Sequence, residues 1–444
     1  VSLWNFIAAH VLQTMTIPAL PECHRQNERL TEIRCRLDAL ANQHCQAFFN
    51  NEPGPDLAQI TGLLKEVDVM YNELGIHERA KADMMVGCGW HMLGQDDKAF
   101  DPLMRAVASD GCMSASDQLS AILVVMPLLR KKCQWRQIIE AGDKARKLAA
   151  GVWVDPVLPF LKGMALERLK CTEQAANHLE ESIAMKPGFR QAHLEFQQAA
   201  SELDDVERCR RVAQLLVDQG GYWVNCLQRP LHFTSNPKVR SQPWYDPQLF
   251  ELVHALEKNF HAIRGELEAF NKSRWSSVGS AHRGNENSRH DADLVSTGEW
   301  REVVLLGDSD ECEENCRECP MTAELLRSFS EVSQCAEMRL GESLFSQLLP
   351  GTRLRSHCGP SNLRLTCHLG IRIPSGCKIV CGGEPCCWEE GKCIVFDDSF
   401  EHEVLHEGDE ARTVLLVNFW HPDVPPEMRH GLMSAARSPH DLAA

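Results

Sequence analysis

The secondary-structure pattern of this chain changes once, and that change limits it to helices first and strands later. From Ile76 to Gln219, apolar residues recur at helical spacing in one segment after another. After Gly341, short β-like runs follow, separated by turn residues such as Pro374-Ser375-Gly376. We therefore expect an α+β multidomain protein, in which a helical array precedes a compact antiparallel barrel or jelly roll. With 444 residues the chain has room for both.

The helical part repeats with a period of about 38 residues. Three segments align, each with an apolar helix end, a polar turn and the start of an amphipathic helix: Met92–Phe100, Leu128–Trp135 and Arg168–Ala175. The last repeat closes on Met185-Lys186-Pro187, which resembles the end of a tetratricopeptide repeat. Such an array leaves a concave face for peptides or partner domains. An ordinary helical bundle is the alternative.

These patterns predict three parts: an N-terminal helical segment (1–75), the repeats (76–220) and a C-terminal domain (221–444). A connector rich in proline, glycine and aromatic residues spans 220–245. Beyond it we expect one amphipathic helix over Leu249–Phe270 and a mobile polar loop over Ser276–Asp293. Strands are expected at Leu363–His368, Gly370–Ile373, Cys377–Cys381, Cys393–Phe396 and Thr413–Trp420.

The net charge limits the partners that the chain can bind, and the N-terminal residues leave open whether it carries a signal or membrane anchor. The net charge of −16 argues against nucleic acid or an anionic membrane surface, because both favour basic patches. Residues Ser2–Leu20 carry no Asp, Glu, Lys or Arg, but Pro18 and several polar residues interrupt the apolar run. The segment is read either as an apolar helix packed on the next domain or as the remnant of a signal or membrane anchor.

The chain has twenty cysteines, and their state stays open from the sequence. Disulfides in an oxidising compartment, free structural thiols and a metal cluster are all compatible with this number. Cys316-x2-Cys319 has the close spacing of a zinc-ligand pair, but the sequence has no clear second pair.

The residues that suggest chemistry are His402 and Arg412, ten positions apart, with His357 forty-five residues upstream of His402. We expect His402 to end one strand and Arg412 to open the next. Two histidines suit a metal ion, and a guanidinium suits a carboxylate at the far end of a co-substrate. Oxygen-activating iron sites usually add a carboxylate in a His-x-Asp or His-x-Glu pair. Here that position is Gly359.

Four blocks resemble the catalytic domain of the aspartyl/asparaginyl β-hydroxylases: His357–Gly370, Trp388–Lys392, Phe396–Val404 and Phe419–Pro422. The resemblance covers roughly 222–430, and that family also has glycine at the position of Gly359. It implies a double-stranded β-helix oxygenase domain after a tetratricopeptide-like array. It also implies Fe(II), 2-oxoglutarate and O2 as cofactor and co-substrates, and hydroxylation of the β-carbon of Asp or Asn in a polypeptide, such as an epidermal-growth-factor-like domain.

Residue by residue, the resemblance implies His357 and His402 as iron ligands and Arg412 as the partner of the distal carboxylate, helped by Ser346. It places His368 at the chelating end of 2-oxoglutarate and Trp300 in the pocket wall. Asp397 and Asp398 are expected to orient the loop before His402.

Two departures stand out. Thr366 replaces a second co-substrate arginine, and Ala323 replaces the partner of Cys316 in a short disulfide loop. Either Cys312 or Cys319 substitutes for that partner, or the loop is open. These departures favour an alternative: a non-catalytic interaction module. A dioxygenase acting on a small molecule or lipid is a third reading. The resemblance favours the endoplasmic reticulum membrane or lumen, with the cytoplasm as the alternative.

Overall fold

The computed structural model of the chain describes residues 28–50, 56–220, 223–230, 233–234, 238–270, 272–278, 294–307 and 309–429. The segment Ser2–Leu20 and most of the predicted loop up to Asp293 therefore lie outside the described residues. The chain separates into two compact units, Val1–Ala199 and Ala200–Ala443. The predicted boundary at residues 220 and 221 stays a prediction.

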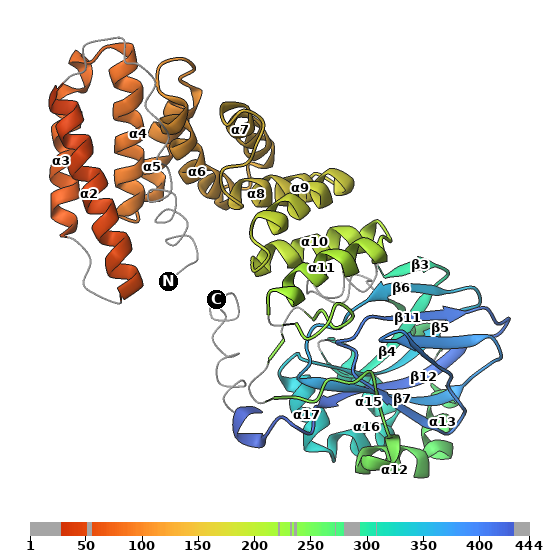
Figure 1. Cartoon of the computed structure of the whole chain (residues 1–444). Coiled ribbons are helices and arrows are strands. Elements are labelled where there is room, and N and C mark those ends of the chain that lie inside the picture. The colour runs from red at the N-terminus through yellow and green to blue at the C-terminus, as the bar shows by residue number, and fades with distance from the viewer. Residues whose placement is uncertain are drawn as a thin grey trace. The chain divides into compact units, whose positions relative to one another are not determined.

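The helices of the first unit follow one another along the chain, and consecutive helices from α2 to α9 pack together (Figure 1). They are α2 (Glu28–Asn50), α3 (Leu57–Met70), the short η1 (Tyr71–Glu73), α4 (Ile76–Met92), α5 (Asp96–Ala108), α6 (Ala115–Lys131), α7 (Trp135–Leu148), α8 (Val157–Arg168), α9 (Thr172–Met185) and α10 (Arg190–Glu202). Contacts between α4 and α6, and between α6 and α8, bring alternate helices together. Small and branched residues such as Ala121, Leu161 and Leu179 fill the buried space between them.

The helices of each pair are joined by one recurring turn. Its central residue has a positive φ: Gly94 (70°), Cys133 (54°) and Lys170 (61°). The next amide donates a 2.9 Å hydrogen bond to the carbonyl five residues earlier: Gln95 to Trp90, Gln134 to Leu129 and Cys171 to Leu166. This is the Schellman arrangement, which ends a helix on a left-handed residue. The three aligned sequence segments are therefore three copies of one helix–turn–helix geometry.

The second unit contains two antiparallel sheets. Its strands are β1 (Trp244–Tyr245), β2 (Ser276–Ser277), β3 (Val295–Thr297), β4 (Trp300–Leu306), β5 (Ser343–Leu348), β6 (Arg353–His357), β7 (Arg364–Arg372), β8 (Cys377–Cys381), β9 (Glu384–Cys386), β10 (Cys393–Phe396), β11 (His402–His406) and β12 (Arg412–Trp420). The large sheet has the order β1-β10-β7-β12-β5-β4-β2, and the small sheet has the order β3-β6-β11-β8-β9.

The helices of this unit are α11 (Val206–Asp218), η2 (Pro247–Leu249), α12 (Glu251–Lys258), α13 (Phe260–Ala269), η3 (Lys272–Arg274), α15 (Cys312–Glu318), α16 (Pro320–Arg327) and α17 (Ser330–Glu337). Residues of α12, α13, α16 and α17 pack on one face of the large sheet, and Figure 1 shows these helices on that side.

Side-chain alternation along the strands of the large sheet separates two cores. On β12, Leu415 and Val417 pack against the helices. Val414 instead joins Ile379 and Val404 of the small sheet in a second core between the two sheets. Because neighbouring side chains of a strand point to opposite faces, Arg412 belongs to the same face as Val414. The strand pattern thus turns Arg412 toward the space between the sheets.

Some predicted elements were wrong in detail. The helix expected over Leu249–Phe270 is divided at Asn259, whose side-chain amide donates to the carbonyl of Ala255 at 2.8 Å and whose position caps α13. His402 begins β11 rather than ending a strand. The two strands predicted on either side of Leu369 are the single strand β7. Ser276 and Ser277, expected in the loop, form the edge strand β2.

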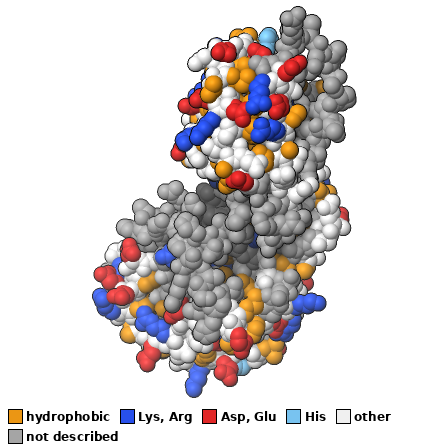
Figure 2. Space-filling model, turned by 90° about the vertical axis from the view of Figure 1, so that its left-hand side faces the viewer, with side chains coloured by type: hydrophobic (Ala, Val, Ile, Leu, Met, Phe, Trp, Pro, Cys, Tyr) orange, Lys and Arg blue, Asp and Glu red, His pale blue; other side chains and the backbone are white. Residues whose placement is uncertain are grey.

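No helix within the described residues is long and apolar enough to cross a membrane. On the face drawn in Figure 2, acidic and basic side chains are interspersed among polar and apolar ones.

Candidate active site

His357 and His402 are direct cross-strand partners on β6 and β11. Their ring centroids lie 4.2 Å apart. Each Nδ1 lies within hydrogen-bond distance of the carbonyl two residues earlier: Arg355 at 2.8 Å for His357 and Phe400 at 2.9 Å for His402. A carbonyl only accepts, so each Nδ1 carries the proton and each Nε2 keeps its lone pair. Burial lowers the pKa of His402, which also favours the neutral imidazole.

Arg412 is almost fully buried, with 2% of its surface exposed. Burial lowers the pKa of its guanidinium to about 10. Its Nε has no hydrogen-bond partner, and no carboxylate within the described ranges forms an ion pair with it. A buried charge without a counter-charge is costly, by several kcal/mol. This guanidinium is therefore suited to an anionic ligand.

Trp388, in the loop between β9 and β10, covers this arginine. The guanidinium carbon of Arg412 lies 4.2 Å from the ring centroid of Trp388. The indole Nε1 donates a 3.2 Å hydrogen bond to Nδ1 of His368. Since that nitrogen accepts, Nε2 of His368 carries the proton, and this buried atom has no hydrogen-bond partner in the part of the chain that is described. His368 thus adds a second unsatisfied donor.

The last two predicted site residues, Ser346 and Trp300, are hydrogen-bonded to each other. Nε1 of Trp300 donates to Oγ of Ser346 at 3.0 Å. The Ser346 hydroxyl thereby uses its oxygen as an acceptor and keeps its own proton for an acceptor elsewhere. Ser346 is buried, and it pairs in register with Val414 on β12.

The structure brings the six predicted site residues to the space between the sheets. The large sheet contributes Trp300, Ser346, His368 and Arg412, and the small sheet contributes His357 and His402. Phe396 connects the two groups, with ring centroids 5.1 Å from His368 and 5.7 Å from His402. The result is a pair of imidazoles that could hold a metal ion, in the same space as two buried donors without partners in the described chain, Nε of Arg412 and Nε2 of His368.

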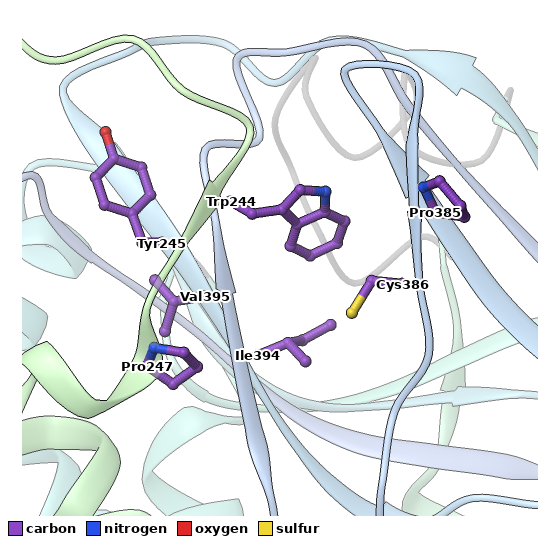
Figure 3. A pocket seen from close by; sticks show the side chains of 7 residues that line it. All are labelled: Trp244, Tyr245, Pro247, Pro385, Cys386, Ile394 and Val395. Atoms are coloured by element: carbon purple, nitrogen blue, oxygen red, sulfur yellow. The ribbon is translucent and has the colours of Figure 1, made fainter.

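A shallow apolar hollow of about 200 Å³ lies among residues of β1, β9 and β10 (Figure 3). Its wall consists of Trp244, Tyr245, Pro247, Pro385, Cys386, Ile394 and Val395. The ring of Trp244 packs against Phe396 at 5.5 Å. No charged side chain lines the hollow, so it does not suit an anionic ligand.

The part of the chain that contains these residues is similar to known proteins. A model of the aspartyl/asparaginyl β-hydroxylases matches residues 257–422. The chain carries a domain of the aspartyl/asparaginyl β-hydroxylase family. The mouse aspartyl/asparaginyl β-hydroxylase is 36% identical over 217 residues, which cover 48% of this chain and 27% of that protein. Rat aspartate β-hydroxylase domain-containing protein 2 is 37% identical over 230 residues, 50% of this chain and 64% of its own length.

Human aspartate β-hydroxylase domain-containing protein 1 is 39% identical over 233 residues, 51% of this chain and 56% of its own. The match thus spans between about a quarter and two thirds of these relatives. A Pseudomonas putida prolyl-4-hydroxylase aligns over 36% of this chain and 98% of its own, with 16% identity and a TM-score of 0.18. At that similarity no fold assignment rests on it.

In this β-hydroxylase-family domain, Gly359 has no room for a side chain. A Cβ at this position would lie 2.5 Å from Cγ of Asp398 and 2.7 Å from both carboxylate oxygens. Asp398 itself is held by Arg364, with 2.5 Å between Nη2 and Oδ2. No group of three or more His, Cys, Asp or Glu side chains among the described residues could hold a metal ion. A metal here would rest on two protein ligands.

The two departures from the family pattern have defined surroundings. Thr366 is buried, and its Oγ1 accepts a 2.8 Å hydrogen bond from Asn418 Nδ2. Cys312, Cys316 and Cys319 are free thiols, as are all the cysteines whose side chains the structure describes. Arg327 donates to Sγ of Cys316 at 3.3 Å. The short loop is therefore held by hydrogen bonds rather than by a disulfide.

Sequence reasoning missed Trp388 and Phe396 as members of the site. Both lie in the blocks that carry the family resemblance, but nothing in a tryptophan or a phenylalanine alone indicates a contact with Arg412 or His402. The contact with Arg412 depends on how the loop before β10 folds back between the sheets, which only the tertiary structure gives.

Proposed function

We propose that this chain is an Fe(II)- and 2-oxoglutarate-dependent dioxygenase that hydroxylates the β-carbon of an aspartyl or asparaginyl residue in a polypeptide. The observation that carries the proposal is the buried guanidinium of Arg412, which has no carboxylate partner within the described chain. A dicarboxylate co-substrate supplies the missing anion. The family assignment favours the hydroxylation reaction.

In this proposal His357 and His402 hold the iron through Nε2, while their Nδ1 protons stay on backbone carbonyls. Such outer-shell bonds fix the tautomer and raise the basicity of the ligand nitrogen. When bound, Fe(II) supplies the redox chemistry with O2, and two protein ligands leave coordination positions open for it. Arg412 and Ser346 bind the distal carboxylate, and His368 donates to the end nearer the metal.

Each turnover consumes one 2-oxoglutarate and one O2 and releases succinate and CO2. One oxygen atom enters succinate and the other becomes the hydroxyl of the product, while the substrate loses a C–H hydrogen to that hydroxyl. The chain contributes binding, orientation and exclusion of water from the space between the sheets. Phe396 and Trp388 provide the apolar wall of that space.

The finer assignments belong to the same proposal. Two antiparallel sheets with a site between them support a double-stranded β-helix, and the recurring helix pairs support a tetratricopeptide-like array. The first unit would offer a surface for an extended polypeptide. Epidermal-growth-factor-like domains are the first substrates to test. The endoplasmic reticulum as location, the cytoplasm as alternative, and a membrane anchor stay predictions.

A turnover assay tests the function. With Fe(II), 2-oxoglutarate, O2 and an epidermal-growth-factor-like peptide, we expect succinate in equal amount to hydroxylated peptide. His402→Ala should abolish both products. His254→Ala, a histidine substitution on α12 outside the site, should leave them unchanged. Hydroxylated product from His402→Ala would contradict the proposed metal site.

The second candidate is a non-catalytic interaction module, and Thr366 is the observation in its favour. Calorimetry of 2-oxoglutarate binding to the protein loaded with Zn(II), which supports binding but not turnover, separates the two. A dioxygenase binds the dicarboxylate, and Arg412→Gln weakens that binding by at least about tenfold, since a charged contact is lost. If the wild-type protein does not bind it, the interaction module is the better reading.

A further inference from the structure

Trp388 contacts two groups that serve opposite ends of the proposed co-substrate pocket. Its ring lies over the guanidinium carbon of Arg412 at 4.2 Å, and its Nε1 donates to Nδ1 of His368 at 3.2 Å. The Trp388 and His368 rings are nearly parallel, at 19°, with centroids 6.0 Å apart. Trp388 is 6% exposed, so these contacts are shielded from water.

We propose that Trp388 is a positioning residue that sets both the orientation of Arg412 and the tautomer of His368, and so prepares the pocket for a dicarboxylate before it arrives. The proposal rests on the proposed function for the identity of the ligand. The contacts of Trp388 with Arg412 and His368, and the tautomer of His368, are properties of the ligand-free chain and do not depend on that function.

The tautomer follows from donor and acceptor chemistry. An indole N–H only donates, so Nδ1 of His368 accepts and the ring proton sits on Nε2. Nε2 is buried and unpartnered within the described chain, as is Nε of Arg412. Buried donors are nearly always satisfied in folded proteins, so two such orphans on either side of one indole indicate a ligand with at least two acceptor groups.

The threonine at position 366 makes the tautomer of His368 more important for binding a carboxylate. The family pattern has a second arginine at that position, two residues before His368. Here the position is neutral and already bonded to Asn418. The N–H of His368 is therefore a principal donor to the chelating end of the ligand, and it exists only while Nδ1 is held as an acceptor. In the opposite tautomer the pocket would present a lone pair to a carboxylate, which repels it.

Two substitutions separate the two contacts. Trp388→Phe keeps an aromatic ring over Arg412 and removes only the N–H donor, whereas Trp388→Leu removes both. Nitrogen-15 NMR of histidine-labelled protein reports the tautomer without any ligand, with His368→Gln to assign the signal. We expect the wild-type protein to show the Nε2–H form at His368 and Trp388→Phe to show a mixture of forms.

Calorimetry with 2-oxoglutarate on the Zn(II)-loaded protein gives the second readout. We expect Trp388→Phe to bind about three- to tenfold more weakly, the size of one hydrogen bond. Trp388→Leu should lose about a further threefold or more with the cation–π contact. Trp420→Phe is the matched control, because Trp420 is buried near Arg429 and its indole N–H has no partner in the described residues. It should leave both readouts unchanged.

The proposal is overturned if wild-type His368 is protonated on Nδ1, or if Trp388→Phe leaves the tautomer unchanged. An altered tautomer with unaltered affinity also overturns it, because the tautomer would then not prepare the pocket. If the wild-type protein binds no 2-oxoglutarate, the proposed function and the ligand role of Trp388 fail together. A tautomer shift in that case still establishes the contact with His368. Trp388→Phe is close in volume to the wild type, so the test does not depend on whether Trp388→Leu folds.

Discussion

Thr366 lies two residues before His368 on β7, which faces the proposed co-substrate pocket, and it is short and neutral where the family pattern has arginine. Its hydroxyl is engaged by Asn418, which also accepts from the amide of Glu342 at 2.9 Å. In the proposed pocket the buried guanidinium of Arg412 lies at the far end. A carboxylate bound at the near end would meet the neutral N–H of His368 instead of a second cation.

Restoring the arginine should therefore tighten co-substrate binding. We expect Thr366→Arg to lower the Kd for 2-oxoglutarate by about tenfold or more, the size of a charge-assisted contact of roughly 1.5–3 kcal/mol. The same change leaves Asn418 without an acceptor, so the free energy of unfolding should fall by about 1–3 kcal/mol. Calorimetry and urea unfolding measure the two effects.

Thr366→Val is the control for Thr366→Arg, because it removes the hydroxyl without adding charge. It should lose the same stability and gain no affinity. Equal affinity in both variants would mean that position 366 does not reach the ligand in this chain.

Among the elements, the turn between β10 and β11 carries a carboxyl group, that of Asp397, whose pKa burial raises strongly. Asp397 is fully buried at the end of β10, and its pKa is raised to about 7, chiefly by burial. The amide of Ser399 donates to its Oδ1 at 3.0 Å, and Gln228 donates to Oδ2 at 3.3 Å. These bonds hold the turn that leads into His402.

The raised pKa of Asp397 predicts a pH dependence of stability. Between about pH 4 and pH 7 the folded protein keeps this proton and the unfolded chain releases it, so the stability contributed by Asp397 falls as pH rises through that window. Asp397→Asn does not titrate. The free energy of unfolding of the variant should therefore rise relative to wild type from about pH 4 to pH 8, by up to about 4 kcal/mol.

Urea unfolding of both proteins at several pH values measures this difference. A difference for Asp397→Asn that stays constant across the window would contradict the raised pKa.

Local sequence patterns predict strands well where turn residues bound a short apolar run, as for β8 and β10, whose ends match the expectation. They fail at Leu369, where a break between two strands was expected and the structure has the single strand β7. In the structure a Cβ at Gly370 would lie 2.3 Å from the carbonyl oxygen of Glu389, so the glycine marks a close approach within β7 and not a turn. The pairing of His357 with His402 depends on strand register across forty-five residues, which no local pattern encodes. The resemblance supplied the candidate residues, and only the fold brings them together.

On the scale of the whole molecule, helix α11 is bonded to the residue that precedes His402. Glu401 is 5% exposed and pairs with Arg229 at 2.7 Å and with Arg210 of α11. Its backbone amide also donates to the carbonyl of Leu227 at 2.6 Å. Ala213 and Leu216 of α11 pack on Trp223 of the connector. All of these residues lie in the second compact unit, which begins at Ala200.

This network predicts where an independently folding fragment of the second unit must begin. A fragment of residues 200–444 should fold with α11 in place. A fragment of residues 221–444 leaves Glu401 with one arginine and exposes Trp223, which should cost about 3 kcal/mol or more and lower the melting temperature by roughly 10 °C. Differential scanning calorimetry compares the two fragments. Arg210→Ala in the longer fragment isolates the ion pair and should produce only part of the loss, because Arg210 is partly exposed. Equal melting temperatures for the two fragments would instead favour a domain boundary at residues 220 and 221 and would show that α11 is dispensable for the strand that carries His402.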